Sequence, residues 1–406
     1  METRTQKTIN SFGEFMRKRE YNENWGYLVG IRPVKKASRL LSEGKTDDEI
    51  IANYFDDHET PAEAAQLALS VAKAEKPIID EANPRGVSLY IHIPFCPSRC
   101  LYCSFSSRQS ECAPHLIPDY LHALHKELAA ALELVKHNEN VIETIYIGGG
   151  TPTVLSATQL DKLLTPLSNI KVKEFTVEAG RPDTLTREKL AMLKRHNVSR
   201  ISINPQTMND EILSAIGRNH TAAQTRSAVT LARECGFNNI NMDIIAGLPN
   251  ETFDMFRTTV EQVLALEPEN ITVHAMCVKR PSELKEQLEN HKMTDGKIVQ
   301  QMIKFARETL TEHGFLPYYL YRQKYILGDC ENVGYSKPEF LGIYNIHMMS
   351  EIQPIIAVGA GSVTKIFNRE TGKIERIFNV KEAIDYINRV DEMIDRKPTK
   401  LENFTC

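Results

Sequence analysis

The sequence is poor in the features that most often assign a chain to a class at once. Its 406 residues contain one tryptophan, aromatic residues make up 7%, and no apolar run approaches the roughly 18 residues that a membrane span needs. The net charge of −4 gives no electrostatic reason to expect a nucleic-acid or membrane partner. The first 20 residues are polar and mixed in charge, without an apolar signal-peptide core. We therefore expect a cytoplasmic protein.

The cysteines are too few for a disulfide framework. Eight occur in the whole chain, and three of them, Cys96, Cys100 and Cys103, lie together in YIHIPFCPSRCLYCSF at 90–105. The other five are scattered: Cys112, Cys235, Cys277, Cys330 and Cys406. In a reducing compartment, thiols clustered this tightly are more often metal ligands or catalytic groups than bridges.

The composition that remains is that of a globular protein, with 42% hydrophobic and 25% charged residues. Residues 1–86 are expected to be mostly helical, and EANPRG at 81–86 has the Pro and Gly of a linker. Over 87–280, segments with helical periodicity alternate with six short β-branched runs: VSLYIHIPF, ETIYIGGG, EFTVEAG, RISINPQ, NINMDIIAGLP and NITVHAM. The alternation loosens after residue 280, and 281–406 are expected to form a smaller α+β domain packed on the sheet.

This alternation predicts an α/β fold with a parallel sheet of βα units, open or rolled into a barrel. In such sheets the chemistry lies at the carboxyl ends of the strands. The unusual residue clusters of the chain fall at those ends. The sequence therefore predicts one functional site along that edge.

The spacing C-x3-C-x2-C is the strongest chemical signal in the chain. Structural zinc sites usually have four ligands, often in two well-separated CxxC pairs, and no second pair is present. Three thiolates on one loop suit a cubane iron–sulfur cluster with one iron left open for chemistry. A zinc ion completed by His92 or another distant side chain is the alternative.

The surroundings of these cysteines resemble a known family. C-x3-C-x2-C after the first strand of a βα array is the signature of the radical S-adenosylmethionine (SAM) enzymes. YIHIPFCPSRCLYCSF is similar to oxygen-independent coproporphyrinogen III oxidases, also called dehydrogenases, and the likeness continues through GGGTPT (148–153), TVEAGRPDT (176–184), RISINPQT (200–207), GRNH (217–220) and MDIIAGLPNET (242–252). TVHAMCVKR, YYLYRQK, ENVGYSKP and GIRPVKK look most like the HemZ-type subgroup. The resemblance implies a partial (βα)6 TIM-like barrel over 87–280.

The resemblance also implies two cofactors. In this family a [4Fe-4S] cluster on three cysteines binds SAM, and electron transfer cleaves SAM to methionine and a 5′-deoxyadenosyl radical. Cys96, Cys100 and Cys103 are thus implied as cluster ligands, with Tyr90 beside them, although a strand-core tyrosine is the alternative there. The residues implied for SAM are Tyr90, Phe105, Gly148, Gly149, Gly150, Thr151, Glu178, Gln206, Arg218 and Asp243.

Each implied SAM contact has a physical reason. Glycines without side chains let the backbone approach the methionine end of the ligand closely. Glu178 can receive the ammonium group, Arg218 offers a bidentate fork to the carboxylate, and Asp243 can accept both ribose hydroxyls. Phe105 departs from the coproporphyrinogen oxidases, which carry a further cysteine there. An aromatic ring at this position can stack on adenine, but the departure puts equivalence to those enzymes in doubt.

The implied reaction is oxidative decarboxylation of coproporphyrinogen III to protoporphyrinogen IX in haem biosynthesis. Two propionates become vinyl groups with loss of carbon dioxide, two SAM molecules are consumed, and an electron donor of flavodoxin or ferredoxin type is needed. A site for propionates should combine cations with flat apolar surface. Candidates of that kind in the C-terminal region, from the end of the barrel onward, are Lys279, Arg280, Tyr319, Tyr321, Arg322, Lys324, Tyr335 and Lys337.

Two other functions stay open from the sequence. One is a haem-binding or haem-delivery protein that keeps the cluster, and the other is radical chemistry on haem itself. Haem ligation would need an exposed His or Cys, and His92, His274 and His347 are considered for it, although none stands in a haem motif.

Overall fold

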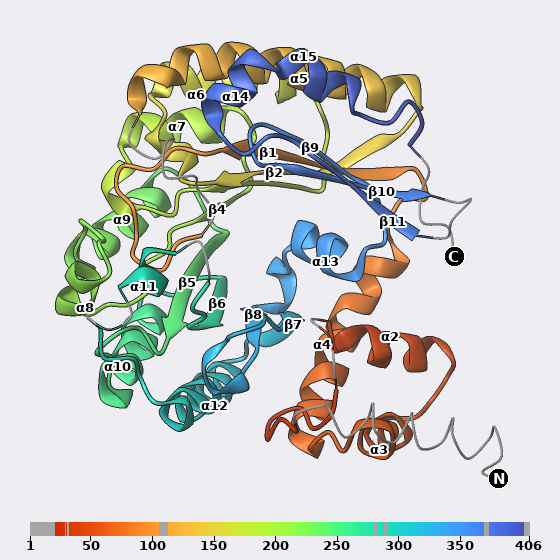
Figure 1. Ribbon diagram of the computed structural model, residues 1–406, viewed down its shortest axis with the longest axis vertical. Helices are drawn as coiled ribbons and strands as arrows, with labels where there is room; N and C mark the ends of the chain where they lie inside the picture. Colours follow the sequence, from red (N-terminus) through yellow and green to blue (C-terminus); the bar gives the residue numbers. More distant parts are fainter. Residues whose placement is uncertain are drawn as a thin grey trace, which may run out of the picture.

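An eleven-stranded sheet organises the chain, in the order β11-β10-β9-β1-β2-β3-β4-β5-β6-β8-β7. The computed structural model describes residues 21–28, 30, 32–104, 113–279, 282–287, 289, 291–368 and 373–401. The sheet curves into an open arc (Figure 1). Within the described residues, no helix has both the length and the apolar character needed to cross a membrane.

Six consecutive parallel strands form the centre of the sheet. They are β1 (Gly86–Ile93), β2 (Val141–Gly149), β3 (Glu174–Glu178), β4 (Arg200–Ser202), β5 (Ile240–Ala246) and β6 (Asn270–Ala275). They coincide with the six β-branched runs, so the predicted α/β fold with a partial barrel is confirmed. β1 is buried along almost its whole length, as expected for a parallel strand covered on both faces.

Helices follow the strands and cover the outside of the arc (Figure 1). They are α5 (Ile117–His137), α6 (Ala157–Leu164), α7 (Arg187–Arg195), α8 (Asp210–Ala215), α9 (Ala222–Glu234), α10 (Phe253–Leu264) and α12 (Gly296–Glu312), with the short α11 (Glu283–Glu286) before α12. Six of these helices begin directly after a side chain that accepts a backbone N–H of the first turn: Ser156, Thr186, Asn209, Thr221, Thr252 and Asp295. Such caps satisfy amides that have no partner inside the helix, and they fix where each strand-to-helix turn ends.

The last third of the chain adds strands to both edges of this sheet. β7 (Leu316–Tyr321) and β8 (Asn332–Ser336) continue it antiparallel beyond β6. At the other edge β9 (Ile355–Val358) pairs parallel with β1, and β10 (Val363–Asn368) and β11 (Lys373–Phe378) follow antiparallel. Residues 281–406 thus contribute strands to the sheet itself, whereas the sequence suggested a domain packed on it.

The last helices lie on opposite faces of the sheet. α13 (Ile343–Ser350) lies inside the arc, facing the centre of the sheet. α14 (Ala383–Asn388) and α15 (Val390–Asp395) lie along α5 on the outside (Figure 1). α13 therefore gives the concave face a helical wall of its own.

The described part of the N-terminal region is helical, with α2 (Val34–Ser42), α3 (Asp47–His58) and α4 (Ala62–Asp80), and α4 packs against β7. Residues 1–20 of the predicted helical region lie outside the described residues. The segment before α2 is fastened by Trp25, the one tryptophan of the chain. Its buried indole Nε1 donates to Glu331 Oε2 at 2.9 Å. The Arg322 guanidinium stacks 5.4 Å above the indole ring and donates from Nη1 to the carbonyl oxygen of Leu28 at 2.9 Å. These contacts join the N-terminal region to the strand pair at the β6 edge.

Candidate functional site

A cavity of about 500 Å³ opens on the concave face, at the carboxyl ends of the strands. Its walls include most of the residues implied by the resemblance: Tyr90, Cys96, Cys100, Cys103, Gly149, Gly150, Thr151, Glu178, Gln206, Arg218, Asp243, Lys279, Tyr319 and Tyr321. Gly148 lies just behind the wall, where a Cβ would come within 3.0 Å of the Glu178 carboxyl group. Phe105 and Arg280 lie outside the described residues.

The loop after β1 presents its three cysteines to this cavity, each partly exposed. The loop folds back on itself through Cys103 N–H, which donates to the carbonyl oxygen of Cys100 at 3.0 Å. Thr151 Oγ1, from the turn after β2, lies in a hydrogen bond 3.4 Å from Cys96 Sγ. No three His, Cys, Asp or Glu side chains in the described part of the chain are arranged around one metal ion. Each thiolate of a cluster binds a different iron, so the three sulfur atoms need not surround one point. The arrangement of Cys96, Cys100 and Cys103 is therefore compatible with a cluster.

The glycine run ends β2 directly against the cysteine loop. Gly149 has φ +118°, and a Cβ there would lie 1.9 Å from the ring of His92. A Cβ on Gly150 would lie 2.9 Å from Cys96 Sγ. Side chains at these two positions would therefore collide with the loop and its support, which is a close backbone approach that only glycine allows.

His92 does not complete a metal site with the cysteines. Its buried ring packs against Gly149, and its Nδ1 is hydrogen-bonded to the carbonyl oxygen of Ala360. Burial lowers the pKa of this imidazole below its usual value, although the bond to Ala360 opposes that shift. The ring therefore supports the end of β2 and is not among the residues that line the cavity.

Glu178, at the end of β3, stands beside a stack of tyrosines. Tyr146 Oη donates to Glu178 Oε1 at 2.6 Å, and the Tyr146 ring stacks 4.5 Å from Tyr344 of α13 and 6.0 Å from Tyr90. Burial raises the pKa of Glu178 to about 7; the bond from Tyr146 opposes this shift, and the negative charge of Asp243 adds to it. Glu178 therefore changes its charge near neutral pH.

We expect SAM affinity to depend on pH through Glu178. The ionised carboxylate accepts an N–H from the ligand's amino group more strongly than the neutral acid does. Because the pKa is raised to about 7, the ionised fraction increases as pH rises, and Kd should fall by about tenfold between pH 6 and pH 8. Isothermal titration with anaerobic protein measures this.

The matched control is Glu178→Gln, which keeps an acceptor for Tyr146 and has no charge to lose. Any slope that remains in this variant reports titration of SAM itself. Equal pH dependence in the two proteins would contradict the role of Glu178.

Asp243, in β5, is held ionised. Its Oδ1 accepts from Asn241 Nδ2 at 2.8 Å, and its Oδ2 lies 3.9 Å from His274 Nε2. Burial by itself would raise the pKa of this carboxyl group, but His274, Asn241 and Thr272 together lower it below the usual value. A buried carboxylate that stays charged is a strong acceptor for hydroxyl groups.

Arg218 and Gln206 carry buried polar atoms that are not satisfied. Arg218 Nη1 donates to the carbonyl oxygens of Gly180 and Asn204 at 2.9 and 2.7 Å, whereas its Nε has no hydrogen-bond partner among the described residues. Gln206 Oε1 is likewise buried without a partner in that part of the chain, and its backbone has φ +67°. Leaving such groups unpaired is costly, so atoms like these at a cavity wall fit a polar ligand.

The far wall of the cavity combines flat apolar surface with one lysine. Tyr319 and Tyr321 of β7 stack at 6.4 Å, and Met348 and Met349 face the cavity from α13. Lys279, after β6, lies at the same cavity. Residues of this cavity that the sequence analysis did not single out include Tyr146, Arg181, Asn204, Asn241, Met348 and Met349. Tyr146 could have been predicted from the sequence, because strand alternation puts it on the same face of the sheet as Gly148.

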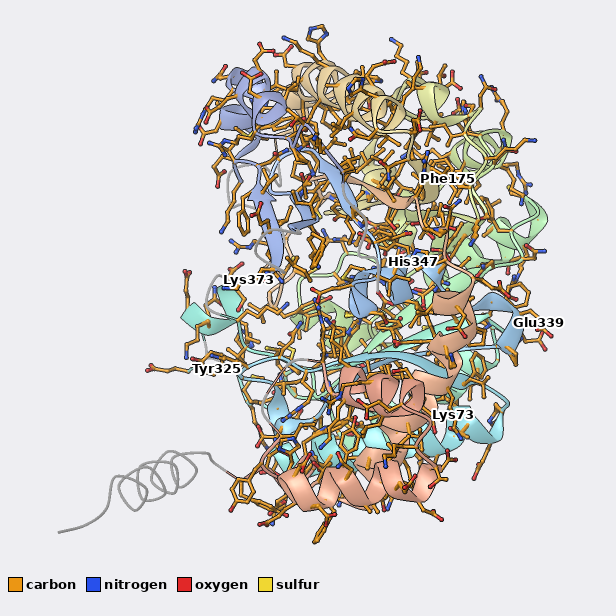
Figure 2. The ribbon with its side chains drawn as sticks, turned by 90° about the vertical axis from the view of Figure 1, so that its right-hand side faces the viewer. Lys73, Phe175, Tyr325, Glu339, His347 and Lys373 are labelled. Atoms are coloured by element: carbon orange, nitrogen blue, oxygen red, sulfur yellow. The ribbon has the colours of Figure 1, made fainter. Side chains whose placement is uncertain are left out.

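Three of the other basic residues proposed for substrate, Arg322, Lys324 and Lys337, are not at the cavity. Arg322 points to Trp25 and Leu28, and Lys337 lies 5.9 Å above the ring of Phe315. The side chain of Lys324 is not part of the cavity wall either. Tyr335 is fully buried in the core. Tyr325, the residue after Lys324, is exposed and points outward from the molecule (Figure 2).

Comparison with known proteins agrees with this geometry. Residues 90–263 match the model of the radical SAM superfamily. Over 387 residues the chain is 40% identical to the oxygen-independent coproporphyrinogen-III oxidase-like protein HemZ of Bacillus subtilis, which covers 94% of this chain and 77% of that protein. The chain belongs to the HemZ family of radical SAM proteins.

Two further matches set this radical SAM chain among its relatives. It is 38% identical over 197 residues to the heme chaperone HemW of Bacillus subtilis, covering 47% of this chain and 51% of HemW. The structure of coproporphyrinogen III oxidase (HemN) from Escherichia coli shares the fold with a TM-score of 0.60 at 21% identity, over 80% of this chain and 73% of that one. Radical SAM proteins use a [4Fe-4S] cluster and SAM, and the thiols and unpaired polar atoms of this cavity fit both.

Proposed function

We propose that this protein is a radical SAM oxidoreductase that converts coproporphyrinogen III to protoporphyrinogen IX without oxygen. The observation that carries the proposal is the composition of the cavity on the concave face. It brings together three thiols, the polar residues of consecutive strand ends, and a wall of aromatic and methionine side chains with Lys279. The long match to the HemZ protein supports the same reading.

Cofactor binding is assigned to the strand ends. Cys96, Cys100 and Cys103 would hold the cluster, which together with SAM supplies the one-electron chemistry that activates a C–H bond. For SAM, Arg218 would hold the carboxylate, Glu178 the amino group and Asp243 the ribose hydroxyls; Gly149, Gly150, Thr151 and Gln206 would complete the pocket. An electron donor of flavodoxin or ferredoxin type remains part of the proposal.

Substrate binding is assigned to the opposite wall. A tetrapyrrole is flat and apolar, and Tyr319, Tyr321, Met348 and Met349 offer a matching surface. Each propionate needs a cationic or hydrogen-bonding partner once it leaves water, and Lys279 is suited to one of them. Arg322, Lys324 and Lys337 are not part of this proposal, because their side chains are not at the cavity.

The reaction is tested by anaerobic incubation of the reconstituted protein with SAM, reductant and coproporphyrinogen III. We expect 5′-deoxyadenosine, carbon dioxide and protoporphyrinogen IX, with a monovinyl intermediate first. A parallel incubation contains haem in place of coproporphyrinogen III. Intact coproporphyrinogen in the first reaction together with loss of haem in the second would instead indicate radical chemistry on haem.

Lys279→Ala should weaken porphyrinogen binding and leave SAM cleavage in place, because the lysine is assigned to a propionate and not to SAM. A charge-assisted hydrogen bond of about 1.5–3 kcal/mol corresponds to a Kd raised at least about tenfold. Lys324→Ala is the matched control, since its side chain does not line the cavity. If both variants bind the porphyrinogen equally well, Lys279 has no such role.

A haem-delivery function is the second proposal, because the barrel also matches heme chaperones over about half of the chain. His347 is buried inside the molecule (Figure 2), bonded through Nδ1 to Gln353 Nε2 at 2.5 Å, and burial lowers its pKa to about 4. His274 lines the cavity between Asp243 and Tyr321. Stable stoichiometric haem binding with no decarboxylated product would favour this function.

A further inference from the structure

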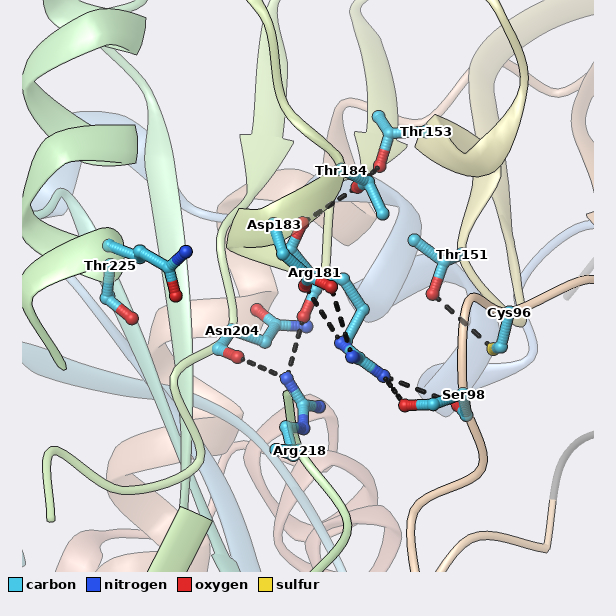
Figure 3. Close-up of polar contacts among 12 residues, drawn as sticks. Cys96, Ser98, Thr151, Thr153, Arg181, Asp183, Thr184, Asn204, Arg218 and Thr225 are labelled. Atoms are coloured by element: carbon cyan, nitrogen blue, oxygen red, sulfur yellow. Dashed lines mark hydrogen bonds and ion pairs between the residues drawn. The ribbon is translucent and has the colours of Figure 1, made fainter. Parts of the chain in front are cut away.

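A buried arginine joins the cysteine loop to the end of β3. Arg181 lies three residues after Glu178, lines the cavity and is 2% exposed. Its Nε and Nη2 donate to the two carboxylate oxygens of Asp183 at 3.1 and 3.2 Å. Its Nη1 donates to the carbonyl oxygen and to Oγ of Ser98 at 3.3 and 2.9 Å (Figure 3). Every nitrogen of the guanidinium is thus engaged.

The partner of Arg181 lies within the cysteine motif. Ser98 falls between Cys96 and Cys100, and its Oγ also donates to the carbonyl oxygen of Gly217 at 3.2 Å. Gly217 has φ +73°, and a Cβ there would lie 2.8 Å from the carbonyl oxygen of Arg99. The loop is therefore fastened between the end of β3 and the turn after α8.

We propose that Arg181 is a positioning residue for the iron–sulfur cluster, holding the Cys96–Cys100 segment through Ser98; this rests on the proposed cluster ligands. The planar guanidinium suits the task, because its donors are fixed in one fork that spans the carboxylate of Asp183 and the loop. A lysine carries only a compact charge and cannot make both sets of bonds. Asp183 in turn balances a charge that would be costly to bury alone.

The same pair also affects the net charge near the proposed cluster. Arg181 and Asp183 together are neutral. Removing the arginine leaves the negative charge of the carboxylate, and removing the carboxylate charge leaves the positive charge of the guanidinium. Because reduction adds an electron to the cluster, nearby negative charge lowers its reduction potential and nearby positive charge raises it.

The test compares Arg181→Met, Arg181→Lys, Asp183→Asn and Ser98→Ala with Arg187→Met. Arg187 is the control, since its ion pair with Glu234 is exposed and joins α7 to α9. Cluster loss to a chelator should be about tenfold faster in Arg181→Met, as for other groups that orient metal ligands. Arg181→Lys should restore only part of the cluster lifetime. Ser98→Ala should shorten the cluster lifetime less than Arg181→Met does, because the backbone carbonyl of residue 98 still accepts from Arg181.

The reduction potential separates this role from mere support of the fold. It should fall in Arg181→Met, rise in Asp183→Asn and stay unchanged in Arg187→Met. Wild-type cluster lifetime and potential in Arg181→Met would overturn the proposal. If Arg181→Met does not fold, a wild-type cluster lifetime and reduction potential in both Asp183→Asn and Ser98→Ala would overturn the proposal equally.

Alkylation of metal-free protein tests the loop contact independently of the cluster. Ser98→Ala removes one contact of the arginine with the loop, and Arg181→Met removes both. Iodoacetamide should therefore modify Cys96 and Cys100 faster in these two variants than in wild type, and Cys235 at the same rate as in wild type. If Cys96 and Cys100 react in both variants at the wild-type rate, the contact between Arg181 and the loop is contradicted. A wild-type protein that binds no cluster would refute the proposed function while this measurement still reports on Arg181.

Discussion

A variant with Ala at Cys96, Cys100 and Cys103 is expected to hold no four-iron cluster after anaerobic reconstitution and to cleave no SAM. The three thiols line one cavity, and thiolate is the usual protein ligand of such clusters. The nearby His92 ring is turned to Ala360 and cannot substitute. Iron and sulfide analysis, with electron paramagnetic resonance of the reduced protein, measures the loss.

Cys277→Ala is the matched control for this result. Cys277 lines the same cavity, but it follows β6, and its Sγ donates to the carbonyl oxygen of Lys324 at 3.1 Å. This variant should keep a full cluster. Native protein with stoichiometric zinc and negligible iron and sulfide would refute the cluster assignment.

Arg218→Ala should keep the cluster and bind SAM far more weakly. Its buried Nε has no partner in the described residues and is available to a carboxylate, and a hydrogen bond between charged groups contributes about 1.5–3 kcal/mol. Kd for SAM should therefore rise by a factor of roughly ten to 150. Asp243→Asn, which keeps the side-chain shape and removes the charge, should weaken binding in the same direction.

Arg218 also bonds two backbone carbonyls, so a change of fold must be separated from a change of ligand contact. Arg226→Ala on the exposed face of α9 is the control, and fluorescence of the single tryptophan reports folding in every variant. Unchanged SAM affinity in both Arg218→Ala and Asp243→Asn would refute the two assignments.

The centre of the sheet was predictable because its strands are local patterns. β-branched runs such as those of β1 and β5 are buried on both faces and are separated by capped amphipathic helices, so they can be found without knowing their partners. The strands β9 and β10 could not be placed in the same way. A short apolar run shows that a strand exists, but its pairing with β1 joins residues far apart in the chain.

The site was predictable at strand ends and not beyond them. Glu178 and Asp243 follow the rule that parallel strands collect their ends at one edge. Arg322 has the right chemistry for a propionate, yet its partner Leu28 is 294 residues away and nothing local shows which way the side chain turns. Met348 faces the cavity only because α13 lies inside the arc, and helical periodicity does not reveal that placement.

The extension of the sheet by late strands has a consequence for biosynthesis. A chain is made from its N-terminus, so the cysteine loop leaves the ribosome long before β9 exists to pair with β1. His92, whose ring packs against the glycine turn, can form its hydrogen bond to Ala360 only after 268 further residues have been made. Until then the turn beside Cys96, Cys100 and Cys103 lacks this support, and the thiols are more open to oxidation. We therefore expect cluster insertion to follow release of the complete chain, and oxygen during translation to lower the yield of protein able to accept a cluster.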